Sequence, residues 1–463
     1  MDRNIRSNGP CADHKTIIRI LLSRADTLSM IGRFQKSLDD TRKALAISRA
    51  MNDREKEIDS LLWEGHAYLK LSDFDGTISS SQQALELSLA EEYLEGQTQA
   101  FYNLGRAHMS KGDDTLALEY MGRTQETAKK TGNNEVLGDT LSDMGLLYKS
   151  MGEYPQAVEC LAQALGLSRQ TGDRHNQAGC LNNLGLIQSA RGDNEQAREN
   201  YESSLSICRE IGDVCGQASV LNNIGAILHL RGNLDGAQQY LLQSLKIRER
   251  TGDLFGQAII LGNLGLQELS RGNFQSSFDF LNRTLLIREK IGDRKGQAST
   301  LNNIGRLLLK QHQPGRASGY LERALVLAQE LGDRELNSRI SLARSELRLE
   351  QKNLPEALKV LEETRQQMEM LGWKQGQADC WLLWGRVCTA QQDWHEAEAK
   401  FKEAIALNEI LKNDRSLAET CLEYGRMLKN SGEERPAAEL LGRAQDLFLR
   451  LNLPERAEQA KNI

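Results

Sequence analysis

A short motif that returns every 40 residues constrains this 463-residue chain more than any other feature of its sequence. The segment 181–185 reads Leu-Asn-Asn-Leu-Gly and recurs with small changes at 221–225, 261–265 and 301–305. Its glycine continues at the same step as Gly65, Gly105, Gly145, Gly385 and Gly425. A fixed period of this length is typical of a repeat protein, in which each unit packs mainly on its neighbours.

Two further glycine series share this period. The first comes seven residues after the motif glycine and consists of Gly112, Gly152, Gly192, Gly232, Gly272 and Gly432. The second precedes the next repeat, is often followed by Asp, and consists of Gly132, Gly172, Gly212, Gly252, Gly292, Gly332 and Gly372. We expect the motif glycine to let a neighbouring helix approach closely. The other two series are expected to end helices in left-handed caps.

Between the glycines, apolar residues have helical spacing. Leu221, Ile224 and Leu228 form one stripe, and Ala237 and Leu241 begin the next. Because the connections are only a few residues long, the two helices are expected to form an antiparallel hairpin. The sequence thus predicts an all-α fold, a right-handed superhelical solenoid of about eleven antiparallel helix-turn-helix repeats. The first helices are expected to start near residues 18, 58, 98, 138, 178, 218, 258, 298, 338, 378 and 418.

The array is expected to span residues 16–453. Residues 1–15 are polar, which predicts a disordered or weakly ordered N-terminus without a secretory signal. Residues 454–463 are expected to be a short tail, too short for a further domain. With so thin a cap, an apolar face near Leu440 and Leu447 would be left exposed, and the array could self-associate there.

The repeat near residue 338 is irregular, because Ser341, Arg344, Ser345 and Arg348 stand where apolar or small residues are expected. A competing stripe, formed by Ile340, Ala343 and Leu347, lies one residue earlier. We therefore expect a one-residue register shift in this repeat. Trp381 and Trp384, in the following repeat, are expected to pack in the core.

The order of residues within each repeat resembles the tetratricopeptide repeat. The pattern is carried by Leu141, Met144, Gly145, Tyr148, Ala157, Leu161 and Ala164. The 40-residue length, which exceeds the usual 34, is similar to the long-helix repeats of kinesin light chains and LGN/Pins-type adaptors. This resemblance implies a cytoplasmic scaffold or adaptor that binds a protein or peptide segment in a concave groove.

The groove is expected to be lined by a ladder of polar residues on the first helices, with apolar and basic residues beside it. These residues are Asn103, Asp143, Asn182, Asn183, Asn222, Asn223, Asn263, Asn302 and Asn303, then Leu186, Leu230 and Leu266, then Arg306 and Lys310. An asparagine both donates and accepts hydrogen bonds and can therefore pair with a peptide backbone. The resemblance implies this role for Asn183, Asn223, Asn263 and Asn303. A purely architectural role for the asparagines remains equally open.

Composition and motifs narrow the function further. The net charge is −6, from 58 basic and 64 acidic residues that are interspersed, so neither nucleic acid nor a membrane surface is an expected partner. The histidines and cysteines show no metal-binding or catalytic spacing, and no cofactor or enzymatic activity is expected. The expected partner is a protein or peptide in an extended or helical form, with apolar and acidic residues. The alternative is a signalling sensor whose superhelix changes pitch when a peptide binds.

Overall fold

The computed structural model describes residues 10–30, 33–411, 413–451 and 453–463, and over these ranges the chain forms 23 helices and no strand. The predicted all-α fold of helical hairpins is confirmed. The chain divides into two compact units, one ending at Ile211 and one beginning at Gly212. Across the described ranges, no helix is both long and apolar enough to cross a membrane.

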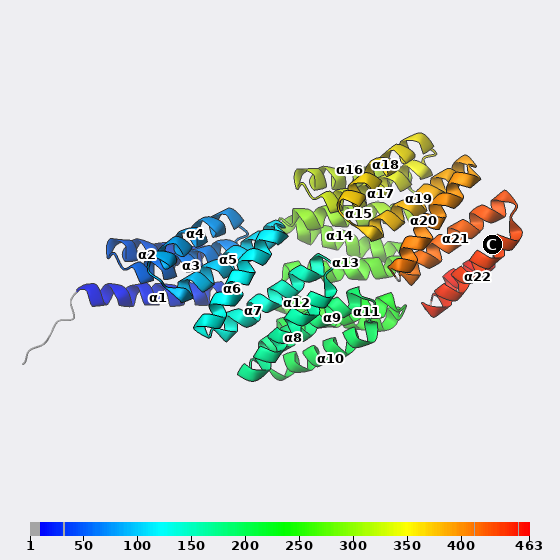
Figure 1. Ribbon diagram of the computed structural model, residues 1–463. Coiled ribbons are helices and arrows are strands. Elements are labelled where there is room, and N and C mark those ends of the chain that lie inside the picture. Colours follow the sequence, from blue (N-terminus) through cyan, green and yellow to red (C-terminus); the bar gives the residue numbers. More distant parts are fainter. Residues whose placement is uncertain (1–9, 31–32, 412, 452) are drawn as a thin grey trace, which may run out of the picture. The chain divides into compact units, whose positions relative to one another are not determined.

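The first unit consists of five helical hairpins, in which each odd-numbered helix packs on the even-numbered helix that follows it (Figure 1). Its helices are α1 (Pro10–Met30), α2 (Phe34–Ala50), α3 (Arg54–Lys70), α4 (Phe74–Ala90), α5 (Leu94–Lys111), α6 (Asp114–Thr131), α7 (Asn134–Ser150), α8 (Tyr154–Thr171), α9 (Arg174–Ala190) and α10 (Asn194–Glu210). Leu141, Leu161 and Leu181 are buried in its largest core cluster.

The second unit consists of six hairpins and one terminal helix. Its helices are α11 (Val214–Leu230), α12 (Leu234–Thr251), α13 (Leu254–Ser270), α14 (Phe274–Lys290), α15 (Arg294–Lys310), α16 (Pro314–Glu330), α17 (Arg334–Glu350), α18 (Leu354–Met370), α19 (Lys374–Gln391), α20 (Trp394–Ile410), α21 (Asp414–Ser431), α22 (Glu434–Arg450) and α23 (Pro454–Lys461). Leu301, Ile304 and Leu321 are buried in its largest core cluster.

The first helices from α3 onward begin about four residues earlier than the sequence analysis predicted, for example at Val214 rather than near residue 218. The reason is the residue after the cap glycine. Asp213 accepts a hydrogen bond from the Gly216 N–H (2.9 Å), and Asp253 accepts one from the Gly256 N–H (2.8 Å). A carboxylate that satisfies these backbone donors starts the helix at once, before the apolar stripe begins.

The motif glycines stand where two helices touch. A Cβ atom added at Gly305 would lie 2.5 Å from Leu321 Cδ2, and one added at Gly185 would lie 2.6 Å from the Tyr201 ring. The predicted close approach of neighbouring helices is therefore confirmed at these positions. Ser345 occupies the equivalent position of α17 and is also fully buried.

The irregular repeat keeps the 40-residue step, because α17 begins 40 residues after α15 and ends 40 residues after it. The buried stripe is nevertheless Ile340, Ala343 and Leu347, as predicted, while Arg344 is only partly buried and pairs with Glu322 (3.5 Å). The shift therefore changes which face of the helix is buried, without any insertion. The same change occurs in α19, where Leu383 is buried.

The buried face of α19 corrects the expectation for the tryptophans. Trp381 and Trp384 are only partly buried, and their ring centroids lie 5.6 Å apart. The Lys400 ammonium lies 5.0 Å and 5.2 Å from the two ring centroids. These side chains therefore cover the edge of the core and do not fill its centre.

Both ends of the predicted array also differ from expectation. Helix α1 begins at Pro10, a residue type favoured at the first helical position, so residues 10–15 are helical; the rest of the expected disordered segment, 1–9, lies outside the described residues. Residues 454–461 form α23, where a tail was expected. Ala457 and Ala460 of α23 pack on the cluster that holds Leu447 and Phe448. Because α23 covers this face, Leu447 is buried and Leu440 is partly buried, so the expected exposed apolar surface at these residues is wrong. Self-association of the array stays a prediction.

Candidate functional site

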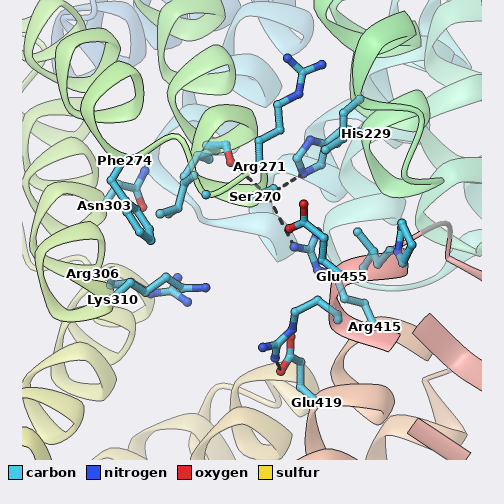
Figure 2. A pocket seen from close by; sticks show the side chains of 17 residues that line it. His229, Ser270, Arg271, Phe274, Asn303, Arg306, Lys310, Arg415, Glu419 and Glu455 are labelled. Carbon is cyan, nitrogen blue, oxygen red and sulfur yellow. Dashed lines mark hydrogen bonds and ion pairs between the residues drawn. The ribbon is translucent and has the colours of Figure 1, made fainter. Parts of the chain in front are cut away.

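A cavity of about 520 Å³ lies within the second unit. One side is formed by the C-terminal halves of α11, α13 and α15 with the starts of α12 and α14, and the other by the first two turns of α21 and the start of α23. The cavity, shown in Figure 2, is called the unit 2 pocket below. It is lined by His229, Leu234, Leu266, Leu269, Ser270, Arg271, Gly272, Phe274, Asn303, Arg306, Lys310, Arg415, Glu419, Leu453, Pro454, Glu455 and Arg456.

The pocket brings together four of the residues predicted from the sequence: Leu266, Asn303, Arg306 and Lys310. Figure 2 shows Arg306 and Lys310 extending into the cavity side by side from α15, opposite Arg415 and Glu419. The other predicted residues lie outside this pocket. They are Asn103, Asp143, Asn182, Asn183 and Leu186 in the first unit, and Asn222, Asn223, Leu230, Asn263 and Asn302 in the second.

The asparagine ladder does not have one environment along its length. Asn103 is fully buried, and its Nδ2 donates to the Leu62 carbonyl oxygen (3.1 Å) of the preceding repeat. Asn263 Nδ2 donates to Asn222 Oδ1 (2.7 Å), which links two consecutive first helices. Hydrogen bonds of this kind stabilise the stacking of repeats. Asn303, in contrast, lies at the wall of the cavity.

In the first unit, the predicted groove residue Asp143 is paired with neighbouring side chains. Asp143 accepts a hydrogen bond from the Tyr102 hydroxyl (3.3 Å) and lies 3.5 Å from Arg106 Nε. Burial raises the pKa of Asp143, which Arg106 and Tyr102 partly offset. The positive and negative charges here compensate each other within the protein.

The unit 2 pocket is charged differently. Five cationic side chains line it, Arg271, Arg306, Lys310, Arg415 and Arg456, against only two carboxylates. Arg271 pairs with Asp235 and Glu268, and Arg456 pairs with Glu419. Within the described part of the chain, Arg306, Lys310 and Arg415 have no ion-pair partner. The pocket therefore carries excess positive charge in a protein whose net charge is −6.

Protein surroundings also alter the acid–base behaviour of the pocket. Burial lowers the pKa of Lys310, as do Arg306 and Arg456, while Glu419 acts in the opposite direction. Burial, together with Arg415 and Arg271, lowers the pKa of His229 to about 4. His229 is therefore neutral at pH 7, and its Nε2 lies 3.5 Å from Ser270 Oγ, where either a donor or an acceptor role is available to the ring.

An apolar surface lies beside these charges. Leu266 is 37% exposed, and Leu269, Phe274, Leu453 and Pro454 continue the lining. This arrangement can hold an anionic group and an apolar side chain of one ligand at the same time. No group of His, Cys, Asp and Glu side chains in the described ranges has an arrangement that could hold a metal ion.

The second wall of the pocket was not predicted from the sequence. Arg415, Glu419 and Arg456 lie more than 100 residues after Lys310 in the chain. Nothing in a single repeat indicates which distant repeat it will face. One local signal was available, since Pro454 followed by Glu and Arg is typical of a helix start and so of a structured end.

Comparisons with known proteins agree with this fold. Models of the tetratricopeptide repeat match residues 136–210, 216–290 and 256–330, and a second such model matches 302–367. Tetratricopeptide repeat protein 29 of Trypanosoma brucei brucei is 31% identical over 119 residues, which are 24% of this chain and 25% of that protein. The match thus spans about a quarter of the length of that relative.

Two solved structures have similar folds. One is a Rap protein complexed with competence and sporulation factor, with a TM-score of 0.54, 14% identity, and coverage of 82% of this chain and 99% of that one. The other is the Rap conjugation gene regulator of the plasmid pLS20 in complex with the Phr* peptide, with a TM-score of 0.50, 13% identity, and coverage of 86% and 97%. These two structures share the fold alone. The family models, which match most of residues 136–367, together with the repeats and helical hairpins identify the chain as a tetratricopeptide repeat protein.

Proposed function

We propose that this protein is an adaptor without catalytic activity that binds an acidic, partly apolar segment of a partner protein in the unit 2 pocket. The observation that carries the proposal is the pair of cations on α15. Arg306 and Lys310 extend into a cavity with no ion-pair partner among the described residues, next to an apolar wall. A protein interaction function in general follows from its family.

The charges give the reason for an acidic ligand. A cation that is partly removed from water is unfavourable unless an anion compensates it. Arg306 and Lys310 remain exposed to solvent at the cavity, and nearby protein atoms lower the pKa of Lys310, which is consistent with a partial cost of this kind. A carboxylate of a bound segment would supply the missing charge, and its hydrogen bonds to Arg306 would be of the stronger, charge-assisted kind.

The remaining lining residues suit the rest of a peptide. Asn303 can donate to a backbone carbonyl and accept from a backbone N–H without selecting a side chain. Leu266 and Phe274 offer apolar area, and burial of such area contributes about 25 cal/mol per Å². The Rap regulator of similar fold was solved with the Phr* peptide bound, which supports a peptide as the class of ligand.

The test is a fluorescence anisotropy titration with two labelled peptides, one of alternating glutamate and leucine and one of alternating lysine and leucine. We expect the acidic peptide to bind the full chain and the basic one not to bind. The variant Arg306→Glu, Lys310→Glu should weaken acidic-peptide binding by at least about tenfold, which corresponds to about 1.4 kcal/mol.

The matched control is Lys246→Glu, Arg250→Glu, which makes the same change of charge on exposed residues of α12 outside the pocket. It should leave the affinity within about twofold at roughly 0.15 M salt, because exposed charges beyond about 8 Å are screened there. Equal loss in both variants, or equal binding of the two peptides, would contradict the proposal.

A further inference from the structure

Glu419 places a negative charge inside a pocket that otherwise attracts anions. Its carboxylate forms an ion pair with Arg456 at the start of α23, and the two side chains are 34% and 35% exposed. Arg456 also donates to Gln459, within α23 itself. The first turn of α23 is thus connected through Arg456 to α21.

Glu419 also acts on Lys310 from across the cavity. Of the charges that affect Lys310, Glu419 is the strongest, and it favours the charged ammonium, against the effects of Arg306 and Arg456. The two side chains are too far apart for an ion pair, since none is formed between them within the described residues. Glu419 therefore compensates Lys310 only in part while it is held by Arg456.

We propose that Glu419 is a specificity-determining residue that occupies the place of the ligand's anionic group. This inference rests on the proposed binding of an acidic segment in the same pocket. A ligand carboxylate that approaches Lys310 and Arg456 must compete with Glu419 for them. The competition weakens binding of any weakly acidic segment and favours segments with neighbouring carboxylates, which bring enough charge to displace it.

Glu455 is the second carboxylate of the pocket and provides a comparison for Glu419. Glu455 is exposed on α23 and has no ion-pair partner in the described part of the chain. It adds the same charge to the same cavity, but it does not hold a cation that the ligand needs. Comparison of variants at Glu419 and Glu455 therefore distinguishes competition for particular cations from a general effect of negative charge in the pocket.

The experiment measures the affinity of the glutamate–leucine peptide for the full chain and for the variants Glu419→Gln and Glu455→Gln. We expect Glu419→Gln to bind about fivefold more tightly than the wild type, the upper range for one exposed ion pair. Glu455→Gln should change the affinity by less than about twofold. Glu419→Ala should show a similar gain in affinity. Because alanine forms no side-chain hydrogen bond, this result would exclude a new hydrogen bond from the glutamine as the cause.

Three results are decisive. Equal tightening by Glu419→Gln and Glu455→Gln would overturn the inference, because the effect would then be one of net charge. An unchanged affinity of both Glu419 variants would overturn it while leaving the proposed function in place. If the wild type fails to bind the acidic peptide but the folded Glu419→Gln variant binds it, the inference stands, and the tested peptide carries too little charge to compete.

Discussion

At the scale of single residues, one backbone position recurs at the end of the helices. From 52 to 432, each described residue at this 20-residue step has a positive φ angle. Most of these residues are glycines, but Asn52, Ser72, Glu92, His312, Lys352 and Gln392 adopt the same conformation. A side chain in this region costs of the order of 1 kcal/mol, so these helix ends are strained relative to the others.

Lys352→Gly should therefore stabilise the protein. Lys352 has a φ of 60° and is exposed, so removal of its side chain relieves strain without the loss of a core contact. We expect the free energy of unfolding to rise by about 0.5–1 kcal/mol in chemical denaturation. Lys352→Ala keeps the Cβ atom and should give no such gain. The prediction fails if both variants behave alike.

The asparagines separate architectural from ligand-contacting roles. Asn103→Ala removes a buried hydrogen bond to the Leu62 carbonyl and should lower stability by about 1–3 kcal/mol. Asn303→Ala, at the pocket wall, should leave the melting temperature nearly unchanged and weaken binding of the acidic peptide. Thermal unfolding and anisotropy measure the two effects. A large destabilisation by Asn303→Ala would assign that residue to the architecture as well.

The fate of these residues shows what the sequence can predict. The period of the glycines reports structure within one repeat. It correctly predicted the hairpins and the close contacts at Gly185 and Gly305. It did not distinguish Asn103 from Asn303, because the two differ only in their neighbours from other repeats. The strained helix end at Lys352 was also not predicted, because the sequence pattern was followed only where the residue is glycine. Lys352 stands at the same position of its repeat and has the same positive φ.

At the scale of elements, helix α7 carries three carboxylates at one-turn spacing, Glu135, Asp139 and Asp143. The pKa of Asp139 is raised to about 6, mainly by burial and also by the charges of Asp143 and Glu135, while Asn176 and Arg106 oppose the rise. An acid whose pKa is higher in the folded state than in the unfolded state binds protons on folding. It therefore destabilises the fold fully above about pH 6, and this cost declines as the pH falls from there toward about 4, the pKa of an unfolded aspartate.

Asp139→Asn should accordingly stabilise the protein at pH 8 and have a much smaller effect at pH 4. We expect a gain of the order of 1 kcal/mol at pH 8, because partial exposure to solvent reduces the full effect. Chemical denaturation of the wild type and the variant at both pH values measures the difference. A gain of equal size at both pH values would show that the carboxylate charge is not the cause.

Helices α17 and α19 show a second limit of local prediction. The stripe of Ile340, Ala343 and Leu347 was identified from spacing alone and is buried. Such a stripe can arise from an inserted residue or from burial of a different face of the helix. The spacing of apolar residues does not distinguish the two, because the buried face depends on the neighbouring helices. The same reasoning applies to Trp384, whose partial exposure follows from the face that α19 buries.

At the scale of the whole molecule, the pocket exists because the second unit brings α15 close to α21 and α23. Two of the five cations of the pocket, Arg306 and Lys310, were predictable, because they lie one turn apart on one helix. The placement of the other three, Arg271, Arg415 and Arg456, depends on how successive hairpins follow one another. Small differences in rotation between successive repeats add up along the chain and determine which distant repeats face each other.

The central claim is that a partner's segment occupies the unit 2 pocket, and site-specific photocrosslinking in the source cells tests it most directly. A photoreactive benzoylphenylalanine replaces Leu266 in the pocket wall or, as a control, Leu286, which is 65% exposed on α14. We predict a crosslinked acidic segment at position 266 only, and its loss in the variant Arg306→Glu, Lys310→Glu. A partner that crosslinks at position 286 and not at 266, or one retained by the charge-reversed variant, would contradict the account.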